Sequence, residues 1–151
     1  MKTSVEVYDR FYEGPVPGSG EDRRETAFSD GYAVAAVMNG RAASAGTAIG
    51  RATVIIDRND IVRVREGAII ISRAASPDLA MAIPKARAMV TEKGGLGATA
   101  SGYARAYGIP AVVGVEDLIS TVKDGDLVHV DGTKGTVKII KLIAGHRPAE
   151  G

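Results

Sequence analysis

The chain has 151 residues, 45% of them hydrophobic and 25% charged, which suits one domain with an ordinary globular core. Its 19 Lys and Arg residues nearly balance its 18 Asp and Glu residues, and a net charge of +1 gives no argument for a nucleic-acid partner or a membrane surface. The absence of Cys excludes disulfides, thiolate metal sites and a Cys nucleophile, and with only two His we expect neither a metal nor another cofactor.

Residues 1–43 are expected to form a partly flexible N-terminal arm. Residues 13–25 concentrate Pro, Gly and charged residues, and an isolated piece of that composition buries little surface. Residues 1–10 lack the apolar core of a signal peptide, and no apolar run in the chain approaches the ~20 residues of a membrane span. A cytoplasmic protein is the simplest interpretation.

Three aromatic residues in this arm have helical spacing. Tyr8, Phe11 and Tyr12 stand at i, i+3 and i+4, which places their rings on one face of a helical turn. This face anchors the arm either on its own domain, which we favour, or on a partner. The apolar run at residues 31–38, near the end of the arm, predicts a first strand or helix.

Residues 44–142 show a regular alternation of strand and helix patterns, and residues 143–151 are expected to form a flexible polar tail. In chain order we expect a strand at 52–56, a short helix or turn at 57–65, a strand at 68–72, a helix at 76–84, a strand at 88–91, a helix at 99–107, a strand at 110–114, a helical stretch at 117–122, and a hairpin of strands 127–130 and 136–140. This alternation predicts an α/β fold with helices packed on a mixed or parallel sheet.

The segment from Thr91 to Gly114 carries the most specific pattern in the chain. Two glycines precede a helix of small residues that contains Ala-Arg, and the sequence Gly-Ile-Pro-Ala-Val-Val-Gly follows. This pattern resembles the signature of the mobile, swivelling phosphohistidine domain of phosphoenolpyruvate (PEP)-utilising enzymes, which include PEP synthase, pyruvate phosphate dikinase and the first enzyme of the sugar phosphotransferase system. The matching residues are Gly94, Gly95, Ala104, Arg105, Gly108, Pro110 and Gly114.

Three shorter matches support the resemblance, which covers about residues 44–142. They are Ala43–Gly46 together with Gly50, Ser76–Asp78, and Val130–Gly132. The resemblance implies a swivelling domain of β/β/α layers. In this family the imidazole of a histidine receives a phosphoryl group from a nucleotide-bound domain, and the domain then swivels to deliver the group to a second domain.

The sequence departs from this signature at its chemical centre. The family's phosphorylated His falls on Thr99, its Ser or Cys on Ala98, and its Thr or Leu on Gly97. A histidine phosphoramidate transfers its phosphoryl group readily, whereas a threonine phosphoester is stable and a Thr hydroxyl needs a base to become a nucleophile. The resemblance therefore implies a pseudo-catalytic phosphotransferase-like domain and leaves open whether the chain is an enzyme. His129 is expected to be a structural residue within a strand, and His146 lies in the tail.

Gly94, Gly95, Gly97 and Thr99 outline a candidate anion site. Glycines let the backbone approach a ligand, and the N-terminus of the following helix attracts negative charge. Thr99, at the position of the family's catalytic His, is suited to cap this helix. The alternative is that Thr99 is only a cap and that the glycines only make the turn.

Tyr103 and Arg105 complete the set of candidate anion-binding residues. Gly102 and Tyr103 lie three and four residues beyond Thr99, so the helix has lost bulk and gained a phenol beside that position. This change either admits a ligand or a partner's side chain, or follows a loss of function. Arg105 cannot share the face of Thr99, and we favour a structural ion pair over a phosphate clamp for it.

Two functions compete. In the first, a stand-alone swivelling domain acts as a non-catalytic or regulatory subunit of a split complex, bound to a separately encoded nucleotide-binding or PEP/pyruvate-binding subunit, as in phenylphosphate synthase. In the second, it is an enzyme component with altered chemistry that binds an anionic small molecule at Gly94–Thr99, since swivelling domains also serve as small subunits of dehydratases. A phosphocarrier that uses another nucleophile ranks last, because no good candidate is visible.

Overall fold

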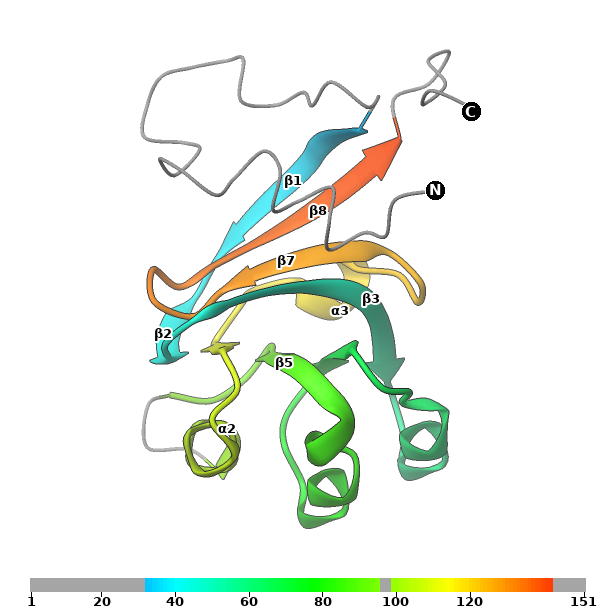
Figure 1. Cartoon of the computed structure of the whole chain (residues 1–151), viewed down its shortest axis with the longest axis vertical. Helices are drawn as coiled ribbons and strands as arrows, with labels where there is room; N and C mark the ends of the chain where they lie inside the picture. Colours follow the sequence, from blue (N-terminus) through cyan, green and yellow to red (C-terminus); the bar gives the residue numbers. More distant parts are fainter. Residues whose placement is uncertain (1–31, 96–98, 143–151) are drawn as a thin grey trace.

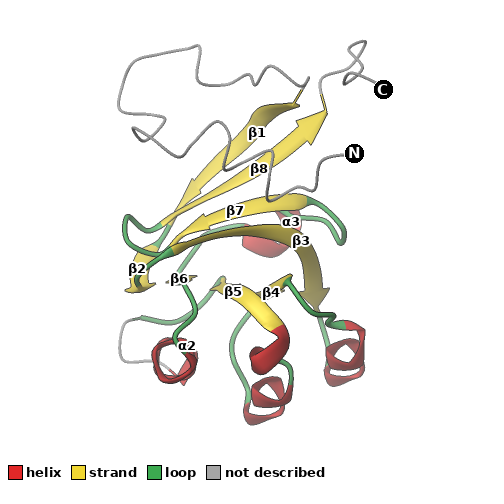
Figure 2. Cartoon of the chain, in the orientation of Figure 1, coloured by secondary structure: helices red, strands yellow, loops and turns green. Residues whose placement is uncertain are grey.

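Two β-sheets and a layer of helices are stacked in the computed structural model, which describes residues 32–95 and 99–142 (Figures 1 and 2). The strands are β1 (Tyr32–Asn39), β2 (Arg41–Ser44), β3 (Thr47–Ile55), β4 (Ala68–Ser72), β5 (Ala86–Thr91), β6 (Ala111–Val113), β7 (Leu127–Asp131) and β8 (Thr136–Leu142). The helices are α2 (Thr99–Tyr107) and α3 (Leu118–Thr121), together with the 3-10 helices η2 (Arg58–Arg63), η3 (Pro77–Met81) and η4 (Ile83–Lys85). The predicted α/β fold with a mixed sheet is confirmed.

The strands follow the order β1-β8-β7-β3-β4-β5-β6-β2. β3 to β6 run parallel, and the other neighbouring pairs are antiparallel. β3 joins two sheets, because residues 47–51 pair with β7 and residues 52–55 pair with β4. We call β1, β8, β7 and the first half of β3 the outer sheet. The inner sheet comprises the second half of β3 with β4, β5, β6 and β2, and it lies between the outer sheet and α2 (Figure 1).

Each interface between these layers has its own apolar core. The core between the two sheets includes Ile69, Ile71, Val90, Val112, Leu118, Val122, Val128, Val130, Val137 and Ile139. The core between the inner sheet and the helices includes Ile70, Leu79, Ile83, Met89, Ala100, Ala104 and Val113. β4 is therefore covered on both faces, which is why its sequence is a continuous apolar run rather than an alternation.

The segment at residues 76–84 differs from the single helix expected there. It forms η3 and η4, two short 3-10 helices with Pro77 and Pro84 at their beginnings. Pro84 has no N–H to donate to the preceding turn, so a continuous α-helix through this position would lose a hydrogen bond and meet a steric clash. Ser76 lies at the cap position of η3 but makes no side-chain cap hydrogen bond.

β1 and all but the last residue of β2 lie within residues 1–43, the range expected for the N-terminal arm. β1 pairs with β8 from Tyr32 to Asn39, with one bulge, and β2 pairs with β6. The run at residues 31–38, for which the sequence allowed a strand or a helix, is thus largely a strand. The predictions for Tyr8, Phe11 and Tyr12, like those for the tail, fall outside the described residues. Among the residues that the structure describes, no helix is long and apolar enough to cross a membrane.

Candidate functional site

The loop between β5 and α2 lies at the edge where the parallel strands end. Because β3 to β6 run in the same direction, their carboxyl ends meet at one edge of the inner sheet. Ligand sites of open α/β sheets form at such edges. Gly94 and Gly95 follow β5 there, and Thr99 begins α2. Gly97 and Ala98 lie outside the described residues.

The first half of this loop is held by hydrogen bonds. The hydroxyl of Thr91, which is fully buried, donates to the carbonyl oxygen of Lys93 over 2.7 Å. The Lys93 N–H in turn donates to the Arg73 carbonyl over 2.8 Å, which ties the loop to the end of β4. Gly94 then adopts a φ of 114°, in the region that L side chains avoid. The sequence needs a glycine at this position for the chain to turn.

The end of β6 packs against the same loop. Gly114 has a φ of 71°, and a Cβ atom built on it would lie 3.2 Å from the carbonyl oxygen of Gly94. The N–H of the next residue, Val115, donates to the Thr91 carbonyl over 3.1 Å. Two glycines that carry the family resemblance, twenty residues apart, are therefore in contact in the structure.

Helix α2 is fixed to the loop by a side chain that the sequence analysis missed. Ser101 is fully buried, and its hydroxyl donates to the Gly95 carbonyl over 3.0 Å. Ala100 and Ala104 flank it and pack into the core beneath the inner sheet. The available signal was a polar residue on the small-residue face of the helix. The hydrogen bond itself joins residues six apart, across the loop, and local patterns do not predict it.

Thr99 is exposed at the first position of α2. Residues 96–98 lie outside the described residues, so the role of a helix cap, which the sequence analysis gave to Thr99, stays a prediction. Gly102 is exposed too, and a Cβ built there would meet nothing within 4 Å. Tyr103 is half-buried against the core of the helix layer. Beside Thr99, the surface of α2 thus has free space at Gly102, and the half-buried ring of Tyr103 fills part of the surface next to it.

Arg105 makes a contact away from the loop. Its guanidinium donates to the Ala43 carbonyl over 3.1 Å and so ties α2 to β2. Arg105 stands six residues beyond Thr99, which is about 9 Å along a helix at 1.5 Å per residue. The structure thus brings Gly94, Gly95 and Thr99 to one corner and gives Arg105 a bond to the backbone of another strand.

The charges around this corner are mixed. Arg41, Arg73 and Lys93 are exposed basic residues at or beside the ends of β2, β4 and β5. Glu116 and Asp117 follow β6 and are exposed as well. The edge therefore offers cations to an anion without being uniformly basic. Within the described ranges, no group of three His, Asp or Glu side chains is arranged to hold a metal ion.

His129 lies far from the corner in the layered structure. It is in β7 of the outer sheet, opposite Ile49 and Lys138, and it is 4% exposed. The pKa of His129 is lowered to about 3, first by burial and then by the positive charge of Lys138, while Asp131 acts in the opposite direction. A neutral, buried imidazole on the other side of the inner sheet does not serve as an acceptor at the Thr99 corner.

Two other segments of the family resemblance meet at the β7–β8 turn. A Cβ on Gly132 would overlap the carbonyl oxygen of Ser44, and the Gly132 N–H donates to the Gly46 carbonyl over 2.7 Å. The hydroxyl of Thr133 accepts from the Gly46 N–H over 2.9 Å, and Asp131 shapes the turn by accepting from the Thr133 N–H over 3.0 Å. The hairpin is therefore locked to the turn between β2 and β3.

Comparison with known proteins agrees with these observations. Residues 64–135 match the family described as "PEP-utilising enzyme, mobile domain". A probable phosphoenolpyruvate synthase of Pyrococcus abyssi is 40% identical over 101 residues, which are 67% of this chain and 12% of that protein. Rifampicin phosphotransferase of Bacillus cereus is 36% identical over 97 residues, 64% of this chain and 11% of that protein. The chain thus spans about an eighth of the length of such relatives.

A solved structure supports the fold alone. The crystal structure of Thermococcus kodakaraensis aconitase X in its holo-form superposes with a TM-score of 0.53 at 19% identity. The match covers 69% of this chain and 98% of that chain.

Proposed function

We propose that this chain, whose residues 64–135 match the family of PEP-utilising enzyme mobile domains, works as a swivelling module without carrying the phosphoryl group itself. In this proposal the chain is a non-catalytic or regulatory part of a phosphotransferase-type complex. Its partner is a separately encoded subunit that binds a nucleotide or binds PEP or pyruvate. The module keeps the layered scaffold and the docking faces, and it lacks the phosphoryl acceptor.

One observation carries the proposal: the position at which the resemblance places the family's histidine is occupied by Thr99, exposed at the start of α2. A hydroxyl at that position needs a neighbouring base to attack phosphorus, and its phosphoester would not pass the group on. The described histidine, His129, is buried in the outer sheet. Chemistry and position therefore both argue against a phosphohistidine at this corner.

Transfer from the nucleotide-binding domain of a related PEP synthase tests the proposal. Wild-type protein should bind that domain, as measured by calorimetry, and should acquire no acid-labile phosphate from ATP. The double variant Ala98→Ser, Thr99→His restores the family-like pair and should acquire acid-labile label. Label on wild-type protein that disappears in His129→Gln or His146→Gln would overturn the proposal, as would the absence of any binding.

A second candidate function rests on the open surface beside Thr99. The free space above Gly102 lies in the first turns of α2, three residues beyond Thr99 and close to the glycine loop. Arg41 and Lys93 flank that loop. On this basis the chain would be an enzyme component with altered chemistry that holds an anionic small molecule at Gly94–Thr99. Backbone N–H groups of the loop and of the first turn of α2 would supply the hydrogen bonds.

A further inference from the structure

β1 is the last strand of the outer sheet, and no described strand lies on the side away from β8. It ends the strand order, and β8 is its one partner within residues 32–95 and 99–142 (Figure 1). A strand at the end of a sheet presents a row of backbone N–H and C=O groups to its surroundings. The edge of β1 can therefore accept a further strand.

The hydrogen bonds of β1 show which of its backbone groups point away from β8. The Gly40 N–H donates over 2.9 Å to the carbonyl oxygen of Gly135, the residue before β8. In an antiparallel pair, the backbone groups of successive residues point alternately to one side and the other. Those of Met38 therefore point to β8, whereas those of Val37 and Asn39 point away from it. Among the described residues, no hydrogen bond reaches these outward groups.

The sequence of β1 lacks the features that usually protect an edge strand. The strand contains no charged residue and no proline. Val37 is 53% exposed, and Asn39 is exposed as well. The bulge between Val34 and Ala36 interrupts the first half of the strand only. The second half, residues 36–39, is thus a regular, uncharged and accessible edge.

Two other strand edges of this chain do carry protection. β2, at the far end of the strand order, has only four residues and begins with the exposed Arg41. At the edge of β3, the Asp124 carboxylate accepts from the Val54 N–H, and the Arg63 guanidinium donates to the Val54 carbonyl. Short strands and charged side chains are common means of preventing pairing between chains. β1 has neither, which favours a strand as its partner.

We propose that β1 pairs with the β1 strand of a second copy of this chain, antiparallel, about a twofold axis at Met38. In this register Val37 of each copy is opposite Asn39 of the other. Both residues have outward N–H and C=O groups, so each of the two symmetric pairs exchanges two hydrogen bonds. The register satisfies these groups in both copies and brings no like charges together, because neither strand carries a charge. The interface is isologous, so it closes as a dimer.

A second copy suits this edge because its β1 is already an extended strand. Pairing two formed strands orders less backbone than folding a flexible peptide onto the edge, so it costs less conformational entropy. The end of the strand is also held in place: a Cβ atom built on Gly40 would lie 2.6 Å from the carbonyl oxygen of Val113 in the inner sheet. The dimer goes beyond the proposed function. β1 is in the outer sheet, whereas α2, which begins at Thr99, lies on the other side of the inner sheet (Figure 1).

Sedimentation velocity of the full chain over a series of concentrations tests the dimer. Val37→Lys places a charge at the edge, and Val62→Lys makes the same change at a valine of η2 that is 84% exposed. Wild type and Val62→Lys should sediment as dimers, whereas Val37→Lys should dimerise about tenfold or more weakly. A wild-type monomer would overturn the proposal, because another segment or a different partner would then cover β1. A Val37→Lys dimer as tight as wild type would overturn it too, because the interface would lie elsewhere.

A disulfide tests the register independently, since the chain has no cysteine. Met38→Cys places two thiols at the twofold axis, in a non-hydrogen-bonded pair whose Cα atoms would lie about 4.5 Å apart, within the range of a disulfide. Met81→Cys, at a methionine of η3 that is 77% exposed, is the matched control. Under mild oxidation Met38→Cys should form a covalent dimer, and Met81→Cys should stay monomeric on a denaturing gel. Equal cross-linking of the two variants, or none through residue 38, would contradict the proposed pairing.

Discussion

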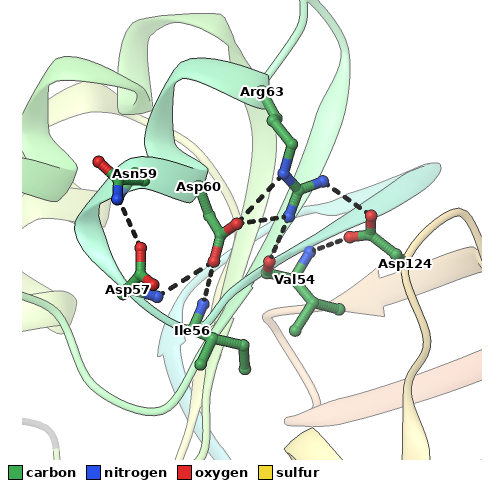
Figure 3. A network of polar contacts seen from close by, with 7 residues as sticks. All are labelled: Val54, Ile56, Asp57, Asn59, Asp60, Arg63 and Asp124. Atoms are coloured by element: carbon green, nitrogen blue, oxygen red, sulfur yellow. Dashed lines mark hydrogen bonds and ion pairs between the residues drawn. The ribbon is translucent and has the colours of Figure 1, made fainter.

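Arg63 and Asp124 form an ion pair of 2.7 Å that completes the hydrogen bonding of β3 (Figure 3). The antiparallel pairing of β3 with β7 ends at Arg51, so no residue of β7 stands opposite Val54. The Asp124 carboxylate accepts from the Val54 N–H over 2.7 Å, and the Arg63 guanidinium donates to the Val54 carbonyl over 2.8 Å. Two side chains thus take the place of a neighbouring strand and protect this edge from pairing with another chain.

Loss of Asp124 should weaken the fold to a measurable but modest extent. Asp124→Ala removes an acceptor from Val54 and a partner from Arg63, and we expect a loss of about 1 kcal/mol in the free energy of unfolding, since both side chains are partly exposed. Asp124→Asn keeps a carbonyl acceptor for the Val54 N–H and should lose less. Urea unfolding measures the difference. Glu66→Ala changes an exposed acid whose side chain makes no hydrogen bond or ion pair with another described residue, so it is the control and should be neutral within about 0.5 kcal/mol.

Protonation of His129 should make the fold sensitive to acid. The folded pKa is lowered to about 3 by burial, against about 6.5 in the unfolded chain, so the unfolded state binds more protons between these values. This contribution to stability is complete above pH 6.5 and is lost as the pH falls toward 3, with a slope of up to about 1.4 kcal/mol per pH unit. The midpoint of thermal unfolding should therefore fall between pH 7 and pH 4.

Variants at the two histidines separate this effect from general acid denaturation. His129→Gln removes the titrating group and should flatten the dependence between pH 7 and pH 4. His146→Gln, in the C-terminal segment, should leave it as in wild type. The lowered pKa of Asp60, which is due first to the N–H groups of Ile56 and Asp57, acts at a lower pH range, below about 4. Equal slopes in both variants would contradict the assignment to His129.

The elements that the sequence predicted well carry strong local signals. Ala68–Ser72 coincides with β4, because burial on both faces requires an unbroken apolar run. The helix at 99–107 ends where Gly108 adopts a φ of 70°, a conformation that favours glycine after a helix. β1 and β2 were placed in the arm, because their Ala-rich sequence between residues 33 and 43 alternates weakly and their pairing with β8 and β6 joins residues far apart in the chain.

The candidate site was predictable only in part, because contacts between residues that are distant in the sequence leave no local pattern. The glycines and Thr99 were found because they are adjacent in sequence to a helix start. The contacts that fix the corner are between distant residues, such as Gly94 with Gly114 and Ser101 with Gly95. Arg105 could not be assigned to Ala43 either, because a hydrogen bond between residues 62 apart leaves no local pattern.

Two glycines should respond to alanine in opposite directions. Gly132→Ala places a methyl group onto the Ser44 carbonyl, between backbones that cannot separate without breaking the hairpin contact, and should destabilise by about 3 kcal/mol or more. Gly102→Ala meets open space within α2 and should stabilise by about 0.5–1 kcal/mol. Thermal unfolding of both variants beside wild type measures the two signs. A stable Gly132→Ala protein would refute the close approach of the two turns.

Thr99 variants test whether the corner binds an anion. If the N–H groups of the Gly94–Thr99 loop and the first turn of α2 hold a negative ligand, a carboxylate introduced there should repel it. Thr99→Glu should reduce the affinity for inorganic phosphate or PEP at least tenfold, and Thr99→Ser, which keeps the hydroxyl, should retain it. Isothermal titration calorimetry at low ionic strength measures both. Glu introduced farther along the same helix, as in Ala106→Glu, controls for the change in net charge, because the helix terminus attracts an anion only within its first turn. Equal affinity in wild type and Thr99→Glu would contradict the anion site. It would leave the proposed swivelling module intact, because that function requires the β/β/α scaffold and its surfaces rather than a ligand at Thr99.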